Sequence, residues 1–199
     1  NKGRRMRGGA AGCGNRTGGD ETGTALLLAP RGKTGHANQA IGVAERLGLP
    51  WRLVEVAAHP IDRLAAGLGR LPAAQAGHRD TRAPLVIASG RQTVPLARAI
   101  AGRPAPRPVV VVLNPPGGDP SDFDLVWASR HDRLSGRADN VVETVTAPGR
   151  LAPADLAPAA ERLAPRIPHL ARPVVSVLVG GASRAYRFGR TEAEELGTV

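Results

Sequence analysis

Short apolar runs alternate with segments of helical periodicity along most of the chain. The runs at 25–29, 85–88 and 109–113 are continuous, which is typical of strands that are buried on both faces of a parallel sheet. The run at 51–56 alternates apolar and polar residues and predicts a strand beside the first one. Further strands are expected at 123–128, 140–146 and 174–179, and helices at 37–47, 94–100, 153–167 and 191–196. This alternation predicts an α/β fold with a Rossmann-like, doubly wound parallel sheet.

The distribution of these segments predicts two domains and a leader. Residues 24–167 are expected to form an N-terminal Rossmann-like domain. Pro168 and Pro173 bracket a linker, and residues 174–196 repeat the order of strand, glycine turn and helix. We therefore expect 168–199 to contain the linker and the beginning of a truncated second Rossmann-like domain. Residues 1–23 are rich in Gly and Arg and are interpreted as a disordered basic leader.

The segment 31–36, Arg-Gly-Lys-Thr-Gly-His, joins the first strand to the first helix. Its two glycines, Gly32 and Gly35, allow a tight turn, and Lys33 adds positive charge beside the unpaired amides of a helix start. This pattern favours binding of a phosphate or carboxylate, although a plain strand-to-helix turn would look similar. A nucleotide-triphosphate loop would need glycine where Leu27 stands, and the third glycine of a dinucleotide fingerprint is missing. We therefore expect no nucleotide cofactor of those two types.

Four loops should meet at one rim, because ligands of parallel sheets bind at the carboxyl ends of the strands. These loops are 31–36, 89–93, 114–118 and 129–132, and we expect ligand contacts there from Gly90, Arg91, Thr93 and His131.

His36 is the candidate proton-transfer residue of this rim, since the pKa of a free imidazole lies near neutrality. A packing or capping role at the start of the helix is the alternative. His131 could act with Asp132 as an oriented base, or the pair could form a simple polar turn. Asp119, Asp122 and Asp124 lack the spacing of a calcium loop, so no metal site is expected.

Composition and charge narrow the classes of partner. The apolar content of 42% is sufficient for a core, and the net charge of +10 attracts anionic partners, including membrane surfaces. No basic run is interleaved with aromatic residues, which argues against nucleic-acid binding. Cys13 is the only cysteine, and no apolar run approaches the ~20 residues of a membrane span.

Four segments together resemble the bacterial and plant mitochondrial-fission ELM family, from about Leu26 to the end of the chain. They are GKTGHANQAIGVAERLGLP, SGRQTVPLARAI, FDLVWASRHDRL and VSVLVGGASRAYRF, in that order. Family members commonly have aspartate where Asn114 stands and Pro-Glu where Ser129 and Arg130 stand. The abundance of Ala, Arg, Gly and Pro indicates a bacterial member.

The resemblance implies a glycosyltransferase-like protein of the two-Rossmann-domain (GT-B) type. It would bind a nucleotide-sugar or another phosphorylated ligand in the cleft between its domains and would need no further cofactor. It places one group of residues on the N-terminal side of that cleft: Gly32, Gly35, His36, Asn38 and Gln39. It places Gly180, Gly181 and Ser183 near the donor diphosphate. Because most of the second domain would be missing, the 199-residue chain is expected to be inactive alone.

A second interpretation comes from the plant relatives, which are associated with the mitochondrial outer surface and the dynamin-type fission machinery. It describes a non-catalytic scaffold protein that attaches to anionic membranes. On either interpretation we expect a cytoplasmic protein, on the second one peripheral to the inner face of the membrane.

Overall fold

The computed structural model describes the chain in five ranges. These are residues 23–57, 76–134, 136–171, 173–179 and 188–198. Most of the expected leader, 1–22, lies outside them. The chain divides into two compact units, Asn1–Ala152 and Pro153–Val199, and each is described by itself.

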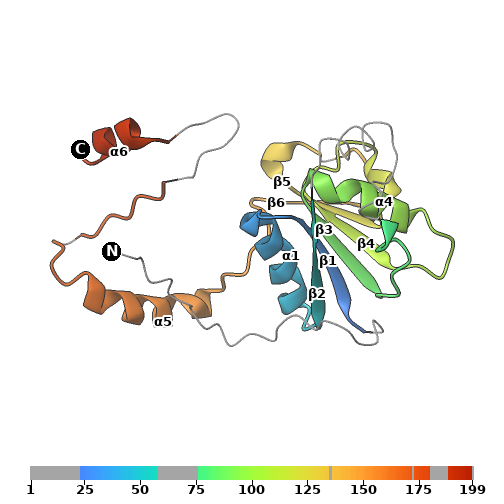
Figure 1. The fold of residues 1–199 in the computed structure, drawn as a ribbon, viewed down its shortest axis with the longest axis horizontal. Helices are drawn as coiled ribbons and strands as arrows, with labels where there is room; N and C mark the ends of the chain where they lie inside the picture. Colours follow the sequence, from blue (N-terminus) through green and yellow to red (C-terminus); the bar gives the residue numbers. More distant parts are fainter. Residues whose placement is uncertain (1–22, 58–75, 135, 172, 180–187, 199) are drawn as a thin grey trace. The chain divides into compact units, whose positions relative to one another are not determined.

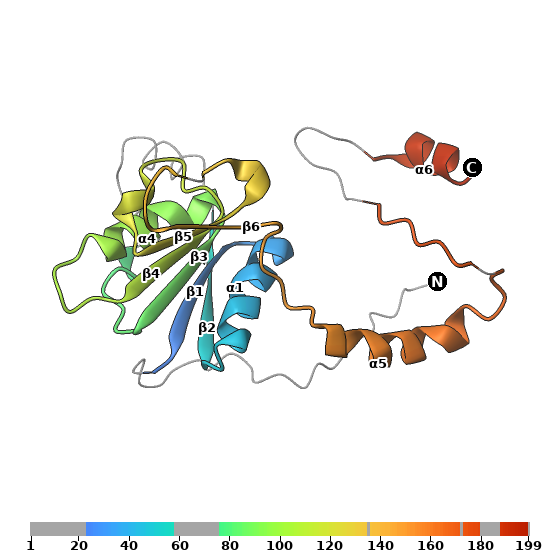
Figure 2. The ribbon, with the colours of Figure 1, turned by 180° about the vertical axis from the view of Figure 1, so that it is seen from behind.

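A parallel sheet forms the centre of the first unit (Figures 1 and 2). Its strands in chain order are β1 (Ala25–Pro30), β2 (Trp51–Val56), β3 (Leu85–Ser89), β4 (Val109–Leu113), β5 (Leu125–Ser129) and β6 (Val141–Thr144). The order across the sheet is β2-β1-β3-β4-β5-β6, and every pairing is parallel. The predicted α/β fold with a Rossmann-like parallel sheet is therefore confirmed, as is the pairing of 51–56 with the first strand.

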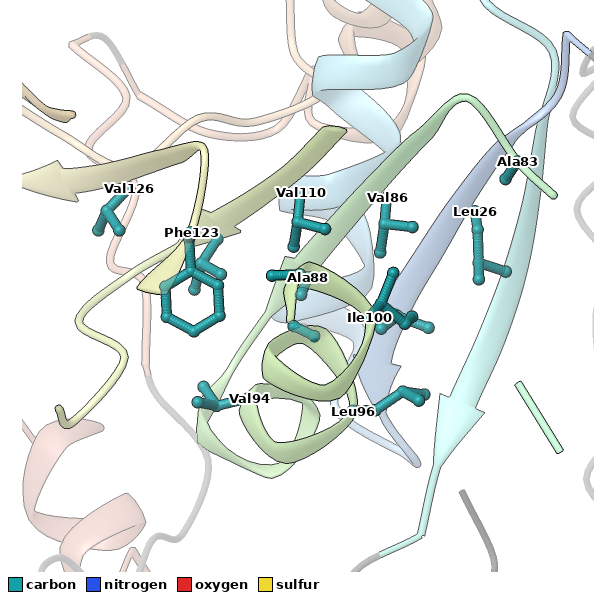
Figure 3. Close-up of a cluster of buried hydrophobic side chains, with 14 of the residues drawn as sticks. Leu26, Ala83, Val86, Ala88, Val94, Leu96, Ile100, Val110, Phe123 and Val126 are labelled. Atoms are coloured by element: carbon teal, nitrogen blue, oxygen red, sulfur yellow. The ribbon is translucent and has the colours of Figure 1, made fainter. Parts of the chain in front are cut away.

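Two helices cover opposite faces of the sheet. They are α1 (Thr34–Arg46), which follows β1, and α4 (Val94–Ala101), which follows β3. Short 3₁₀ turns lie in three of the described connections: η1 (Arg91–Thr93), η2 (Pro120–Asp122) and η3 (Arg130–Asp132). Figure 3 shows α4 in front of the sheet and α1 behind it.

The continuous apolar runs are explained by this two-sided cover. Neighbouring residues of a strand point to opposite faces, so Leu26 and Leu28 pack in the cluster under α4, while Leu27 packs in the cluster under α1. Leu27 and Leu28 are both 0% exposed. Burial of one such side chain stabilises the fold by roughly 1.5–3 kcal/mol, so a polar residue in either place would be costly.

The second unit contains α5 (Pro153–Leu163), η4 (Ala164–Arg166) and α6 (Arg190–Leu196). Both predicted helices are present, but the prediction of a buried strand at 174–179 is wrong for this structure. Residues 173–179 pair with no strand in the described ranges, and Leu178 is 97% exposed. The local apolar run favours a strand, but a strand is completed only by a neighbour that accepts its hydrogen bonds. The apolar side chains of α5 are also exposed, with Leu156 59% exposed.

The chain after β6 passes over α1 at Gly42. A Cβ atom at this position would lie 2.6 Å from the carbonyl carbon and oxygen of Gly149 and 2.9 Å from the backbone nitrogen of Arg150. Beside this contact, Arg150 Nε donates to Glu45 Oε2 at 3.0 Å, and a second nitrogen of the same guanidinium bonds the other carboxylate oxygen. Glycine at 42 therefore permits a backbone-to-helix contact that fixes the end of the first unit.

Replacing Gly42 with alanine should destabilise the first unit, although alanine is the better helix former. The added methyl group meets backbone atoms, which cannot turn away, and overpacking of this kind costs about 1–3 kcal/mol. We expect Gly42→Ala to lower the melting temperature measured by circular dichroism by several degrees. Gly35→Ala is the matched control, since it lies in the same helix and its Cβ would meet open space. Equal melting temperatures for the two variants would contradict the argument.

Candidate functional site

The sheet has a topological switch point between β1 and β3. The connection from β1 leads outward to β2 on one side, and the connection from β3 leads to β4 on the other. The two loops therefore separate beyond the strand ends and leave a crevice, which is where open α/β sheets bind their ligands.

A hollow of about 340 Å³ lies at this point, and we call it the switch-point cleft. It is lined by Pro30, Lys33, His36, Gly90, Arg91, Gln92, Asn114 and Pro115. The lining residues lie at or just after the carboxyl ends of three adjacent strands, β1, β3 and β4. A pocket at the low end of the 300–1,000 Å³ range can enclose a small ligand or one polar group of a larger one.

Gly90 allows the two loops to approach each other. Its φ of 89° lies in the region that favours glycine. A Cβ atom there would be 2.8 Å from Pro30 Cγ and 3.2 Å from His36 Cγ. Any side chain at position 90 would thus push the His36 ring or the end of β1 out of place.

Four side chains form a continuous hydrogen-bonded chain, which we call the relay, and two of them, His36 and Asn114, line the cleft. His36 Nδ1 lies 3.0 Å from Ser89 Oγ, and the Ser89 hydroxyl donates to Gln39 Oε1 at 2.8 Å. Asn114 Nδ2 donates to the same Gln39 oxygen at 2.9 Å. Ser89 is completely buried, so its hydroxyl depends on these partners. The relay joins α1 to the ends of β3 and β4.

The His36 imidazole is held in its neutral form. Burial lowers the pKa of His36 below the ordinary value of 6.5, the Gln39 side chain acts in the opposite direction, and the positive charge of Lys33 lowers the pKa further. Near neutral pH the ring therefore carries one proton, and one of its nitrogens is an acceptor.

Two cations, Lys33 and Arg91, line the cleft together with this ring. Lys33 immediately precedes α1, whose first turn has no acidic residue and no side-chain cap. Arg91 begins η1, directly before α4. Within the described part of the chain, neither cation belongs to an ion pair. The two cations, together with the positive end of the α1 dipole, favour an anion.

The structure groups the residues predicted for the site in three ways. Lys33, His36, Gly90 and Arg91 line the switch-point cleft, and Gln39 lies behind it in the relay. The remaining predicted residues, which do not line it, are Gly32, Gly35, Asn38, Thr93 and His131. Gly180, Gly181 and Ser183 lie outside the described residues.

Local contacts explain three of the residues that do not line the cleft. The amide of Gly32 donates to Glu55 Oε1 at 3.3 Å. Thr93 is buried and donates to the carbonyl of Gly90 at 2.8 Å, so it stabilises the turn. The side chain of His131 is 79% exposed on η3, with Nε2 3.6 Å from Asp132 Oδ1.

Two residues of the relay, Ser89 and Asn114, are not among the residues predicted individually from the sequence. Both were placed on the rim by their loops, but nothing local distinguishes a hydroxyl or amide that contacts α1. Only their position in the chain indicates that they belong to the site, because Ser89 ends β3 and Asn114 directly follows β4. Among the described residues, no group of three or more His, Cys, Asp or Glu side chains could hold a metal ion.

Comparison with known families now identifies the chain. The sequence model described as Mitochondrial fission ELM1 matches residues 34–199. The chain belongs to this family. The matched region starts at the first residue of α1 and includes all four members of the relay. The ELM family predicted from the sequence is thereby confirmed, whereas the glycosyltransferase-like activity remains a prediction.

Two further findings bear on this ELM1-family protein. A search of curated proteins found no match. Within the described ranges, no helix combines the length and the apolar character required to cross a membrane.

Removing the charge of Lys33 should raise the pKa of His36. Lys33 lowers this pKa through space, and its loss makes protonation of the ring easier. We expect the ring of Lys33→Met to titrate at higher pH than that of the unmodified chain in an NMR titration. Lys33→Arg keeps the charge and should leave the titration nearly unchanged. If the Met variant titrates like the Arg variant, Lys33 does not act on the ring as described.

Proposed function

We propose that this ELM1-family protein binds a phosphorylated small molecule of the nucleotide-sugar class in the switch-point cleft. One observation carries the proposal, namely that Lys33 and Arg91, which have no carboxylate partner in the described part of the chain, line the same hollow at the switch point of the sheet. Each feature alone is common in α/β folds. Their convergence around a concave surface is what a bound phosphate requires.

The neutral His36 adds a second kind of recognition. A cleft made only of cations would accept any anion, but an uncharged imidazole can also bond a hydroxyl group. A nucleotide-sugar offers both, since its diphosphate is anionic and its sugar carries hydroxyls. In a glycosyltransferase-like reaction, His36 would be the group that accepts the proton of the attacking hydroxyl.

The volume of the cleft limits what it holds. About 340 Å³ is enough for the charged centre of a nucleotide-sugar and part of its sugar. We therefore expect this cleft to supply anion and hydroxyl contacts, with the base of the nucleotide bound elsewhere.

Calorimetry with the 199-residue chain tests the proposal. We expect heat of binding for at least one nucleoside diphosphate sugar in a panel and for inorganic pyrophosphate, its minimal anionic part. Lys33→Ala and Arg91→Ala should each weaken binding about tenfold, since a hydrogen bond to a charged group contributes about 1.5–3 kcal/mol.

Arg46→Ala is the matched control. It removes the same charge from the opposite end of α1, so it should leave the affinity unchanged. Absence of heat across the whole panel, pyrophosphate included, would refute the proposal. Equal weakening by all three variants would show that net charge, rather than the cleft, attracts the anion.

A non-catalytic membrane scaffold is the second candidate function, and the net charge of +10 favours it. Charge of this sign draws a protein to anionic lipid surfaces, and the attraction falls with added salt. The leader contributes Lys2, Arg4, Arg5, Arg7 and Arg16.

Vesicle co-sedimentation tests this second candidate. The scaffold interpretation predicts binding to vesicles that contain phosphatidylserine, no binding to pure phosphatidylcholine vesicles, and loss of binding when residues 1–22 are deleted. Lys33→Ala should have little effect, because one charge among many is removed. Binding that survives the deletion but is lost in Lys33→Ala would instead point to a lipid phosphate in the switch-point cleft.

A further inference from the structure

We infer that Asn114, Gln39 and Ser89 are positioning residues that fix the proton of His36 on Nδ1 and leave Nε2 as a hydrogen-bond acceptor toward the ligand. This inference deepens the proposed function and rests on it for the identity of the ligand. It concerns the direction of the hydrogen bonds in the relay. That direction determines whether the cleft offers a proton acceptor or a proton donor.

The direction follows from the number of protons each group can give. Asn114 Nδ2 is an amide nitrogen, so it donates to Gln39 Oε1. The same oxygen has a second lone pair and accepts the hydroxyl proton of Ser89. A hydroxyl has one proton to donate, and in Ser89 it is used in this bond.

The contact between Ser89 and His36 must then run the other way. Ser89 Oγ has only lone pairs left, and His36 Nδ1 lies 3.0 Å from it. Two acceptors at that distance would repel each other, so Nδ1 carries the proton and donates it. In a neutral imidazole with Nδ1 protonated, Nε2 holds a free lone pair.

The contacts of the ring leave this lone pair free for a ligand. Nδ1 faces the buried Ser89, and the ring itself lines the switch-point cleft. Nε2 has no hydrogen-bond partner among the described residues, so it is the nitrogen available to a bound molecule. The charged groups that line the cleft with it are Lys33, before α1, and Arg91, on η1.

The groups that line the cleft favour a ligand that carries both an anionic group and a hydrogen-bond donor. Lys33 and Arg91 attract an anionic group, while Nε2 accepts a hydrogen bond from a donor beside that group. A phosphorylated molecule with a neighbouring hydroxyl satisfies both requirements. An unprotonated, oriented imidazole nitrogen is also what general-base catalysis needs.

If the hydrogen bonds of the relay ran in the opposite direction, His36 would adopt the other tautomer. If the Gln39 amide were turned, its nitrogen would donate to Ser89 and to position 114. The Ser89 hydroxyl would then donate to Nδ1, and His36 would carry its proton on Nε2. The two arrangements can be told apart by the tautomer of a single ring.

Long-range ¹H–¹⁵N NMR spectra of the ¹⁵N-labelled chain without ligand test the inference. The chain has five histidines, so the His36 signals are identified by their loss in His36→Gln. At alkaline pH, where the ring is neutral, we expect the shift of an unprotonated nitrogen at Nε2. The same shift at Nδ1 would overturn the inference.

Asn114→Asp is the decisive variant. Aspartate has nearly the same shape, but its carboxylate only accepts hydrogen bonds, so the Gln39 amide should turn and the direction of the relay should reverse. We expect the proton of His36 to move to Nε2. An unchanged tautomer in Asn114→Asp would show that the relay does not control His36.

Two serine variants distinguish the positioning of the His36 proton by Ser89 from a general effect of losing a buried hydroxyl. Ser89→Ala removes the acceptor of Nδ1 and should abolish the preference for the Nδ1–H tautomer. Ser129→Ala removes another buried hydroxyl at a strand end, on β5, without touching the relay, and should leave the tautomer unchanged. Loss of the preference in both variants would contradict the inference. Since no ligand is present, these results are independent of the calorimetric test of the proposed function.

Discussion

The close approach of Gly90 to Pro30 and His36 is the constraint on which the site depends. β1 and β3 are neighbours in the sheet, but their connections leave toward opposite faces. Their ends must therefore remain in contact while the loops beyond them diverge. A residue without a side chain at position 90 satisfies both conditions, because a Cβ would meet Pro30 Cγ at 2.8 Å. The cleft and the orientation of His36 follow from this contact.

The strands of the sheet could be predicted well from the sequence, because each buried strand is marked by an apolar run within its own few residues. A strand covered on both faces needs apolar residues at every position, and 25–29 and 109–113 meet this need. The apolar pattern predicts a helix from Ala37, whereas α1 starts three residues earlier, at Thr34. Its first turn faces the rim rather than the core, so the apolar stripe that marks a helix is missing there. His36 thus belongs to the helix and not to the preceding loop.

The relay and the strand at 174–179 show where local patterns stop being informative. Ser89 bonds Gln39 across 50 residues of sequence, and Asn114 bonds it across 75. Only the order of the strands brings these residues together, and no motif records that order. The error at 174–179 has the same origin, because the hydrogen bonds that complete a strand come from a distant neighbour. The sequence thus identified the rim and its cations but not the polar contacts that orient His36.

Many of the basic side chains of the first unit are already used by the fold, which bears on the choice between a small ligand and a membrane. Arg107 binds Asp124 with two nitrogens, and Arg103 donates to the carbonyls of Arg79 and Thr81. The guanidinium groups of such arginines are held in place by loops and carboxylates, so they are less free to rearrange around an anionic partner. Lys33 and Arg91 differ from them, because both line a concave site beside helix starts and neither is neutralised by a carboxylate in the described part of the chain. Charge placed in this way acts on a ligand that enters the cleft, whereas a flat lipid surface would need the same charge spread over an exposed face.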